Sequence, residues 1–325
     1  SAPMVLCLKT RKSRTLPGIS KMKNLIIVTG GAGFVGSNLI KSLLKKTNKK
    51  IISLDNYSSG NKNNHLKNNR VKYLKADTID ITKILKKEKK QIHSIFHFGE
   101  FARIYQSFKK FDECFKSNSI GSNAVFKFCL DNNIKLIYSA TSAVLGNKGD
   151  DKNLSPYAFT KSKNLELLEN LRKWFNFKFE VIYFYNVYGQ GQIKDGDMAT
   201  VVGIFEDQYK KNKPLPIVKP GTQTRKFTHI DDTIKTCIEA WRRNKCLHYS
   251  ISYKKSYSIN DLAKMFKTKI IYLKSRSGER YASALTKISN NRKIINKYGK
   301  IDLKDYVTSF IKGRNYENKK LIKID

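Results

Sequence analysis

The strongest constraint on the fold is a glycine-rich turn that directly follows an apolar run near the start of the chain. Residues 25–36 read LIIVTGGAGFVG, and the first four are apolar and rich in β-branched side chains, as expected of a buried parallel strand. Gly30, Gly33 and Gly36 then have the G-x-x-G-x-x-G spacing, before a helical pattern begins. Glycines at these positions allow a tight turn, close approach of a pyrophosphate and tight packing of helix on strand. The stretch therefore predicts a phosphate-binding strand–turn–helix unit.

An acidic residue at the end of the next predicted strand strengthens this interpretation. Residues 51–54 form a second apolar run, and Asp55 follows it, 19 residues after Gly36. A carboxylate at that distance can accept hydrogen bonds from the adenosine ribose hydroxyls. A glycine-rich turn alone also occurs in ordinary loops. Together with Asp55 it predicts a bound dinucleotide, NAD in preference to NADP.

Strand-like and helical patterns alternate through the first half of the chain. Further strands are expected at 71–74, 94–99, 134–138 and 180–184, and helices at 79–86, 107–132 and 156–175. Such alternation is typical of parallel strands that are joined by helical crossovers. The predicted fold class is α/β, a Rossmann-type doubly wound parallel sheet with a smaller, interleaved C-terminal substrate-binding lobe.

The sequence divides into three segments. Residues 1–21 hold five Lys or Arg, no acidic residue and no apolar periodicity, and are interpreted as a leader or as sequence added during cloning. Residues 22–185 are expected to form the NAD-binding domain. Residues 186–325 are expected to form mainly the substrate-binding lobe, with about 226–245 returning to the NAD-binding domain.

Composition and charge narrow the function classes. The net charge of +38 would suit nucleic acid or an anionic membrane, but the lysines are spread along the chain and form no recognisable nucleic-acid module. No apolar run approaches the roughly 20 residues that cross a bilayer. The five cysteines are scattered without a C-x-x-C pair, as expected of reduced thiols. We therefore expect a cytoplasmic protein with no bound metal, no specific nucleic-acid partner and no membrane insertion.

A tyrosine and a lysine at the start of a predicted helix suggest proton transfer. Tyr157 and Lys161 are four residues apart, which places both on one helix face. A phenol with an ordinary pKa of about 10 is a poor base at neutral pH, and a neighbouring ammonium stabilises its phenolate. Thr141, at the end of the preceding strand, can hydrogen-bond the same substrate oxygen. The Y-x-x-x-K spacing also occurs on surface helices, but with Thr141 it suits removal of a proton from a sugar hydroxyl whose carbon gives a hydride to NAD.

Together these motifs resemble one family. From about residue 23 to 312 the chain is similar to the extended short-chain dehydrogenases/reductases of the nucleotide-sugar epimerase/dehydratase family. The matching stretches are 29–36, 55–60, 139–146, 156–161, 186–189, 225–232 and 276–279. This collection of stretches is far more specific than any one motif.

The resemblance implies a role for each matching residue. Thr141 is implied as the hydroxyl partner, Tyr157 as the base and Lys161 as the ribose-binding activator. The implied substrate-binding residues are Thr141, Ser142, Asn186, Arg225 and Arg276, the last three for the sugar diphosphate. The predicted cofactor-binding residues are Gly30, Gly33, Phe34, Val35, Asp55, Asn56, Asp77, Thr78, Phe98, Gly99, Asn118, Tyr157 and Lys161. Asp77 either bonds the adenine amino group or caps the helix that follows.

The reaction after C4 oxidation depends on the two residues that follow Thr141. Dehydratases of this family carry acidic residues there, which move the C5 proton and expel the C6 hydroxyl, whereas this chain has Ser142 and Ala143. Alanine cannot move a proton, so a 4-epimerase is predicted, in which the 4-keto sugar turns over and takes the hydride back on its opposite face. One alternative is a 4,6-dehydratase in which Glu100 substitutes as the acid and base. The other is a catalytically silent dinucleotide-binding protein.

The resemblance also implies partners and a setting. Members of the family commonly dimerise by packing two helices from each subunit into a four-helix bundle, which makes 107–132 and 156–175 the candidate dimer segments. A nucleotide-diphosphate sugar is the implied substrate, and synthesis of cell-surface polysaccharide or glycan precursors is the implied setting. NAD is expected to stay bound and to be recycled, because the hydride returns to the substrate.

Overall fold

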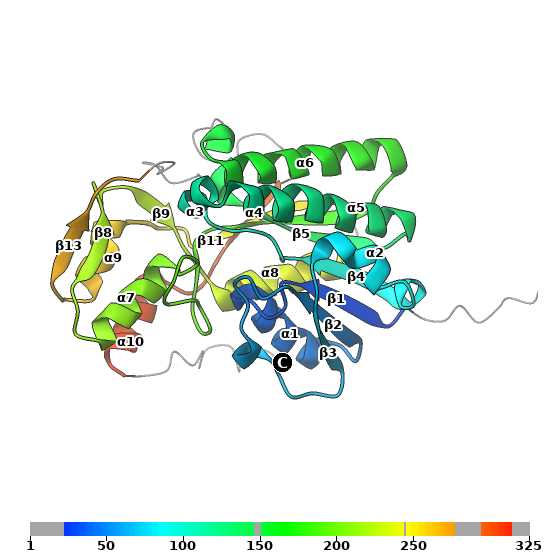
Figure 1. The fold of residues 1–325 in the computed structure, drawn as a ribbon. Coiled ribbons are helices and arrows are strands. Elements are labelled where there is room, and N and C mark those ends of the chain that lie inside the picture. The colour runs from blue at the N-terminus through cyan, green and yellow to red at the C-terminus, as the bar shows by residue number, and fades with distance from the viewer. Residues whose placement is uncertain (1–22, 146–150, 244, 277–293, 314–325) are drawn as a thin grey trace, which may run out of the picture.

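A computed structural model describes residues 23–145, 151–243, 245–276 and 294–313. The segment 1–21, Gly146 and the last three residues of the 276–279 match lie outside the described residues. The described part has one large sheet with helices on both faces, and a smaller group of helices and short strands beyond one end of it, on the left in Figure 1.

The described elements alternate between strands and helices over most of the chain. The strands are β1 (Leu25–Thr29), β2 (Lys50–Asp55), β3 (Val71–Lys75), β4 (Ile92–His97), β5 (Lys135–Thr141), β6 (Phe179–Phe184), β7 (Val187–Tyr188), β8 (Leu215–Val218), β9 (Thr224–Lys226), β10 (Thr228–His229), β11 (His248–Ser252), β12 (Ser256–Ser258), β13 (Ile270–Leu273) and β14 (Ile294–Tyr298). The α-helices are α1 (Phe34–Lys46), α2 (Ile81–Ile84), α3 (Ile104–Lys109), α4 (Phe111–Phe115), α5 (Ser122–Asp131), α6 (Pro156–Phe175), α7 (Val201–Lys210), α8 (Ile230–Arg242), α9 (Ile259–Met265) and α10 (Leu303–Ile311). Short 3-10 turns are η1 (Lys62–Asn64), η2 (Thr78–Asp80), η3 (Lys89–Gln91) and η5 (Ser142–Val144), and η4 (Lys116–Gly121) is π-helical.

Eight parallel strands form the large sheet, in the order β14-β11-β6-β5-β4-β1-β2-β3. The chain begins in the middle of the sheet, winds outwards to β3, and then returns to β4 on the other side of β1. Connections therefore leave β1 and β4 in opposite directions, which opens a crevice at their carboxyl ends, where ligands of such sheets bind. The predicted doubly wound α/β fold is confirmed.

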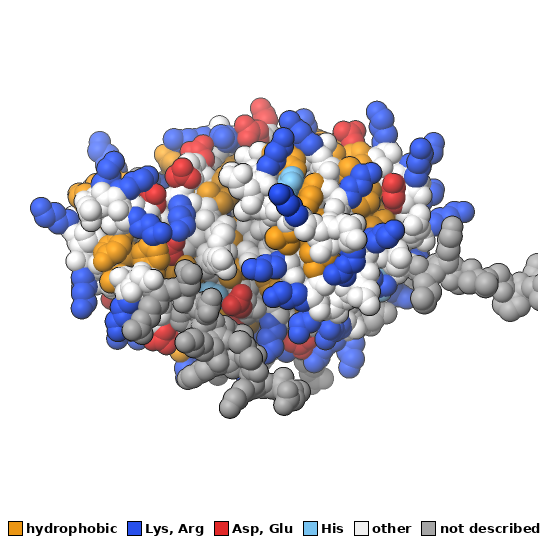
Figure 2. Space-filling model, turned by 90° about the horizontal axis from the view of Figure 1, so that it is seen from below, with side chains coloured by type: hydrophobic (Ala, Val, Ile, Leu, Met, Phe, Trp, Pro, Cys, Tyr) orange, Lys and Arg blue, Asp and Glu red, His pale blue; other side chains and the backbone are white. Residues whose placement is uncertain are grey.

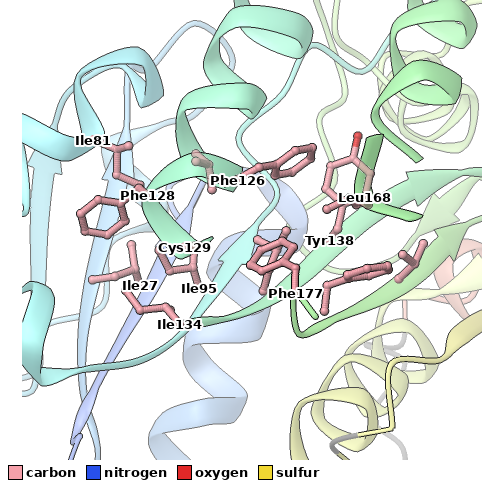
Figure 3. Packing of buried hydrophobic residues seen from close by; sticks show 14 of the residues in the cluster. Ile27, Ile81, Ile95, Phe126, Phe128, Cys129, Ile134, Tyr138, Leu168 and Phe177 are labelled. Carbon is pink, nitrogen blue, oxygen red and sulfur yellow. The ribbon is translucent and has the colours of Figure 1, made fainter. Parts of the chain in front are cut away.

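Two apolar layers hold the helices on the faces of this sheet. On one face α2, α5 and α6 bury a cluster that includes Ile81, Phe126 and Leu168 (Figure 3). On the opposite face α1 and α8 contribute Leu39 and Ile234. Because the central strands are covered on both faces, they read as continuous apolar runs and not as alternating ones.

The smaller lobe has a core of its own. Helices α7, α9 and α10 and strand β8 bury Phe205, Leu262, Val307 and Leu215. Between its segments the chain returns to the large sheet: α8 packs against β6 and α1, and β11 and β14 extend the sheet beyond β6. The two lobes therefore interleave in the described part of the chain, and the exact domain boundaries stay a prediction.

The helical pattern expected over 107–132 corresponds to several consecutive helical elements. Helix α3 begins earlier, at Ile104, and ends at Lys109, because Lys110 leaves the helical region with φ −119° and ψ 53°. The chain then continues through α4, η4 and α5 to Asp131. A π-helical turn accommodates one extra residue, and within η4 the side chain of Asn118 is fully buried.

Basic side chains are distributed over the surface. Figure 2 shows Lys and Arg across one whole face, not as a single stripe, with few acidic side chains between them. In the part of the chain that the structure describes, no helix has both the length and the apolar composition needed to cross a bilayer. The high positive charge therefore belongs to the face as a whole and not to one localised patch.

Candidate active site

The carboxyl ends of the central strands open into one cavity of about 1000 Å³, which the smaller lobe also lines. Every predicted site residue except Asn118 lines this cavity, from Gly30 in the first turn to Arg276 near the end of the described chain. Residues that are hundreds of positions apart in the sequence thus converge. A single continuous cavity is what a dinucleotide and a second ligand need in order to react.

The glycine-rich turn is tightly constrained at two positions. Gly30 has φ +69°, and a Cβ there would lie 2.8 Å from the backbone of Gly99. A Cβ on Gly36 would lie 2.1 Å from the carbonyl oxygen of Gly30, so no larger residue allows α1 to pack this closely. Helix α1 begins at Phe34, with Gly33 as its N-cap, and both line the cavity. Its unpaired N–H groups and its dipole are therefore placed for a pyrophosphate.

Asp55, at the end of β2, presents an oriented carboxylate. Oδ2 accepts the N–H of Ala32 at 2.9 Å, and Oδ1 accepts the N–H of Tyr57 at 2.8 Å. Burial raises the pKa of Asp55, and these two N–H groups act against that shift. Because each carboxylate oxygen has a further lone pair, the fixed group can still accept bonds from two ribose hydroxyls.

Asp77 fulfils one of its two suggested roles. Its Oδ1 accepts the N–H of Ile79 at 3.1 Å, which caps η2, and its Oδ2 accepts from the Asn56 amide at 3.4 Å. Asp77, Asn56 and Thr78 all line the cavity. The helix cap is thus observed, and the contact with adenine stays a prediction.

Asn118 is the predicted cofactor residue that the structure keeps out of the cavity. Its Oδ1 accepts the N–H of Phe101 at 2.7 Å, and its Nδ2 donates to the Phe101 carbonyl at 3.0 Å and to the Thr160 hydroxyl at 3.2 Å. The amide is fully buried and is directed at the protein itself. Asn118 thus fixes the loop after β4 against α6 and does not line the cavity, and its contact with the cofactor stays a prediction.

Helix α6 carries the predicted base at its start. The hydroxyl of Ser155 accepts the N–H of Ala158 at 3.1 Å, and Pro156 occupies the first turn, a favourable N-terminus. Tyr157 comes next and is 8% exposed, and Lys161 follows one turn later on the same face. Both residues line the cavity. A well-capped first turn therefore fixes the phenol relative to the ammonium.

The end of β5 lies beside this tyrosine. The hydroxyl of Thr141 accepts the N–H of Ala143 at 3.1 Å and so begins η5. Ser142 and Ala143 are buried, and Ala143 belongs to the small apolar cluster that contains Tyr157. A methyl group thus fills the place where a dehydratase of the resembling family would carry an acid.

The Glu100 carboxylate is surrounded by hydrogen-bond donors of the protein. Its Oε2 pairs with the ammonium of Lys161. Its Oε1 accepts from three further groups, the hydroxyls of Ser122 (2.8 Å) and Tyr138 (3.0 Å) and the amide of Asn164 (3.2 Å). The side chains of Glu100 and Lys161 are only 2% and 4% exposed. A carboxylate that accepts from four donors is the acceptor-only, ionised form, which has no proton to give.

The charge state of Lys161 follows from these neighbours. Burial lowers the pKa of Lys161, and the Glu100 carboxylate raises it. The ammonium also donates to the carbonyl of Ser139 at 2.7 Å and lies 4.8 Å from the centre of the Tyr138 ring. Burial raises the pKa of Tyr138 well above its ordinary value, so its hydroxyl keeps its proton and donates it to Glu100. Glu100 is thus the counter-ion that keeps Lys161 charged.

A line of buried hydrogen bonds joins this ion pair to the glycine-rich turn. The Ser122 hydroxyl donates to Glu100 and lies 2.9 Å from Nε2 of His97, whose Nδ1 lies 2.8 Å from Oγ1 of Thr29. Oγ1 of Thr29 also accepts two backbone N–H groups from the loop after β4. Burial lowers the pKa of His97 to about 4, so its ring is neutral. Because the Ser122 hydroxyl donates its hydrogen bond to Glu100, its oxygen accepts one from His97. The single ring proton of the neutral His97 is therefore assigned to Nε2.

The residues implied for the sugar diphosphate come from the end of β6 and from the smaller lobe. Asn186 has φ +33°, and its amide donates to the carbonyl of Lys226 at 2.8 Å. Arg225 is buried, and the guanidinium of Arg276 lies 5.1 Å from the centre of the Tyr105 ring. Asn186, Arg225 and Arg276 line the cavity, and their contact with a diphosphate stays a prediction.

Three residues that shape the cavity carry no sequence motif. Phe101, Arg103 and Met198 line it, and Phe101 and Met198 pack in the cluster that contains Tyr157. The first two lie just after β4, so proximity to a strand end was an available signal. Met198 lies in an irregular segment after β7, where no local pattern marks it.

Comparison with known proteins identifies the family. The family model described as the NAD dependent epimerase/dehydratase family matches residues 26–252. A candidate UDP-glucose 4-epimerase of Methanocaldococcus jannaschii is 30% identical over 275 residues, which cover 79% of this chain and 88% of the relative.

Solved structures agree with that result. A UDP-glucuronic acid 4-epimerase from Bacillus cereus, in complex with UDP-glucuronic acid and NAD, is 27% identical with a TM-score of 0.77, over 89% of this chain and 99% of the other. The dTDP-glucose 4,6-dehydratase DesIV from Streptomyces venezuelae shares the fold, with a TM-score of 0.79 at 18% identity, over 89% of this chain and 96% of the other.

The cavity fits the cofactor that this family uses. The amino end of α1 and the oriented carboxylate of Asp55 line it together, and this donor and acceptor set suits a pyrophosphate and a ribose diol. The chain therefore belongs to the NAD-dependent epimerase/dehydratase family, and it is an NAD-dependent enzyme of the nucleotide-sugar epimerase type.

Proposed function

We propose that the protein is a nucleotide-diphosphate hexose 4-epimerase. The observation that carries the proposal is the turn after β5, where Thr141 lines the same cavity as Tyr157 and where Ala143 packs in the cluster of the tyrosine. This turn supplies a hydroxyl for C4 chemistry but no carboxylate for the C5 proton. The similarity to 4-epimerases of UDP-linked sugars supports the same reaction.

In the proposed reaction, side chains of this protein remove one proton from the sugar and later return it. The phenolate of Tyr157 accepts the proton of the C4 hydroxyl, while the hydroxyl of Thr141 hydrogen-bonds the same oxygen. The ammonium of Lys161, which Glu100 keeps charged, stabilises that phenolate. NAD, when bound, supplies an acceptor that takes the hydride from C4 and returns it. After the 4-keto sugar has turned its other face, Tyr157 gives the proton back, so that proton and hydride both balance.

The surroundings of Glu100 do not favour the dehydratase alternative. Both carboxylate oxygens already accept from protein donors, and one of them pairs with the buried Lys161. To take the C5 proton, Glu100 would have to leave this pair. Breaking a buried ion pair on one side costs about 3–5 kcal/mol. The epimerase proposal needs no such rearrangement.

The reaction is tested by incubating the purified protein with a panel of nucleotide-hexoses and analysing the products by mass spectrometry and chromatography. An unchanged mass with a new isomer would establish the epimerase. A product lighter by one water would instead establish a 4,6-dehydratase and point to Glu100. If no sugar is converted by a protein that still binds NAD, the silent dinucleotide-binding protein is the better description.

Replacing Asp55 with alanine should weaken NAD binding about 10- to 100-fold, because hydrogen bonds to a charged group contribute about 1.5–3 kcal/mol. Isothermal titration with NAD, on protein freed of cofactor, measures the change. Asp112→Ala, at an exposed acid on α4 that does not line the cavity, is the matched control. Unchanged NAD affinity in a normally melting Asp55→Ala protein would show that this carboxylate does not hold the ribose.

We also propose that the chain forms a homodimer through the outer surface of α4, η4 and α6, which lie side by side (Figure 1). Phe111, Phe115 and Phe159 stack there, with ring centroids 4.5 Å and 6.3 Å apart. Phe111 is 51% exposed and Ile120 is 57% exposed. A contiguous exposed aromatic surface favours burial against a partner, and a second copy is the partner that the family resemblance implies.

Replacing Phe111 with lysine should raise the dimer dissociation constant at least about 10-fold. The change removes an aromatic contact, and in a symmetric interface it brings two like charges together. Sedimentation velocity over a concentration series measures it. Ile271→Lys, at a 46% exposed position on β13 in the smaller lobe, is the control and should leave the dimer intact. An Ile271→Lys protein that is monomeric while Phe111→Lys stays dimeric would place the interface elsewhere.

We also propose a location and a pathway. The scattered thiols and the family resemblance support a cytoplasmic enzyme that supplies precursors for polysaccharide or glycan synthesis. Among the described residues the thiols of Cys114, Cys129, Cys237 and Cys246 are free. Measuring the enzyme's activity in separated cell fractions tests this location.

A further inference from the structure

Arg103 lies where the cavity meets the start of α3. It is the N-cap residue of this helix and lines the cavity. Ile104, its neighbour in the sequence, and Met198 both pack against the cluster that contains Tyr157. The guanidinium also interacts electrostatically with the Tyr157 phenol. Arg103 is therefore at the reacting end of the cavity.

Among the described residues, the hydrogen bonds of the Arg103 guanidinium go only to neutral carbonyl groups. Its Nη1 donates to the carbonyl of Ala102 at 2.9 Å, and its Nη2 donates to the carbonyl of Met198. Its Nε is buried and has no hydrogen-bond partner. An arginine has five N–H donors, so these two bonds leave Nε–H and one N–H on each Nη for a ligand.

The nearby carboxylates do not compensate this charge. Glu100 pairs with Lys161, and Asp197, next to Met198, pairs with Lys110 at 3.4 Å. Within the described ranges of the chain, no carboxylate forms an ion pair with Arg103. Burial lowers the pKa of Arg103, and the Tyr157 phenol acts against that shift. An anionic group entering the cavity would relieve this cost of burial.

We propose that Arg103 binds a carboxylate carried by the sugar, so that the substrate class is a nucleotide-diphosphate hexuronic acid. This inference rests on the proposed function, which assigns the diphosphate to Asn186, Arg225 and Arg276 and so leaves the sugar as the source of a further anion. A guanidinium offers two parallel N–H donors to the two oxygens of a carboxylate. The carboxylate would stand in place of the C6 hydroxymethyl group of an ordinary hexose, and C4 epimerisation proceeds unchanged.

The test compares two substrates that differ only at C6, UDP-glucuronate and UDP-glucose, with the GDP-linked pair of mannuronate and mannose run in parallel. The value of kcat/KM for isomer formation is measured for wild type, Arg103→Met and Arg103→Lys. Lys110→Met is the matched control, because Lys110 is a second cation of the same cavity wall and is already paired with Asp197. Thermal melting of each variant shows whether it folds.

We expect wild type to prefer the uronate by about 100-fold or more in kcat/KM, as for a desolvated charge pair. Arg103→Met should lose most of that preference while it converts the hexose within a few-fold of wild type. Arg103→Lys should keep part of the preference, and Lys110→Met nearly all of it.

Two results would overturn the inference and leave the proposed function intact. One is a wild type that converts the hexose at least as well as the uronate. The other is an equal loss for both substrates in Arg103→Met, which would mean that Arg103 holds the diphosphate or only the Met198 segment. If wild type converts neither substrate of either pair although it binds NAD, the proposed function fails and the inference fails with it. If Arg103→Met does not fold, the ratio of kcat/KM for the uronate to kcat/KM for the hexose in Arg103→Lys decides. An unchanged ratio in that variant would contradict the inference, because lysine cannot form the bidentate contact.

Discussion

Replacing Tyr157 with phenylalanine should reduce kcat about 10²- to 10⁴-fold and leave NAD binding intact, because positioned proton transfer contributes an effect of that size. The phenolic oxygen is the only atom that this change removes. The ring is 8% exposed and packs with Phe101 and Ala143, contacts that phenylalanine keeps. Without the phenol, the first turn of α6 has no group that can take the C4 hydroxyl proton.

The change in kcat is measured on whichever nucleotide sugar the wild type converts, with NAD content determined on the same preparation. Tyr272→Phe, at a 51% exposed tyrosine of β13, controls for loss of a tyrosine hydroxyl that does not line the cavity. If Tyr157→Phe retains about a tenth of the wild-type kcat or more, the base lies elsewhere. Loss of both kcat and NAD binding would mean that the variant disturbs the cavity as a whole.

Replacing Glu100 with glutamine should have the second largest effect, on both stability and turnover. The amide has nearly the same size but leaves Lys161 buried without a counter-ion, which lowers the free energy of unfolding by about 3–5 kcal/mol. The NH₂ group of the glutamine would also face hydrogen-bond donors, because the wild-type carboxylate accepts from Ser122 and Tyr138. Urea unfolding, with and without NAD, measures the loss.

The pH dependence of turnover should shift as well. Burial lowers the pKa of Lys161 and Glu100 raises it, so removing the carboxylate lowers that pKa further. The ammonium is then lost at a lower pH than in wild type. If the phenolate of Tyr157 needs this ammonium, the alkaline limb of the kcat profile should move to lower pH in Glu100→Gln.

A matched variant separates this role from direct chemistry. Glu113 also lines the cavity but is exposed, so Glu113→Gln should leave both the unfolding free energy and the alkaline limb unchanged. If Glu100→Gln is as stable as wild type and keeps its alkaline limb, Glu100 is not the counter-ion described above. Loss of water elimination alone, on a substrate that wild type dehydrates, would make Glu100 the acid and base of a dehydratase.

Local patterns were sufficient for six of the eight strands of the large sheet and for the cofactor turn. Strands that are covered on both faces leave a continuous apolar signature, and the glycines report backbone constraints that only their own turn imposes. Asp55 was predictable because its place, one strand after the turn, is fixed by the connection itself. The structure therefore has the central strands and Asp55 at the positions that the sequence predicts.

Polar partners over long separations were not predictable. Glu100 and Lys161 are 61 residues apart, and they meet because α6 packs against β5, the neighbour of β4 in the sheet. The sequence alone therefore indicates a carboxylate on a loop for Glu100. It also predicts a cofactor ligand for Asn118. Strand β14, short and at the sheet edge, has no clear periodicity. Arg103 matches no motif. The proposal for it depends on an Nε–H without a hydrogen-bond partner, which no sequence pattern indicates.

The hydrogen-bond line from Thr29 to Lys161 also bears on how the chain can evolve. With the tautomer assigned to His97, every hydrogen bond in it is donated in the same direction, through His97 and Ser122 to the anion of Glu100. A lone substitution at any of the five leaves a neighbour inside the protein with a donor facing a donor, or with nothing to face. Descendants of this chain should therefore change these positions in concert, as one inherited block, while the lysines of the surface drift independently.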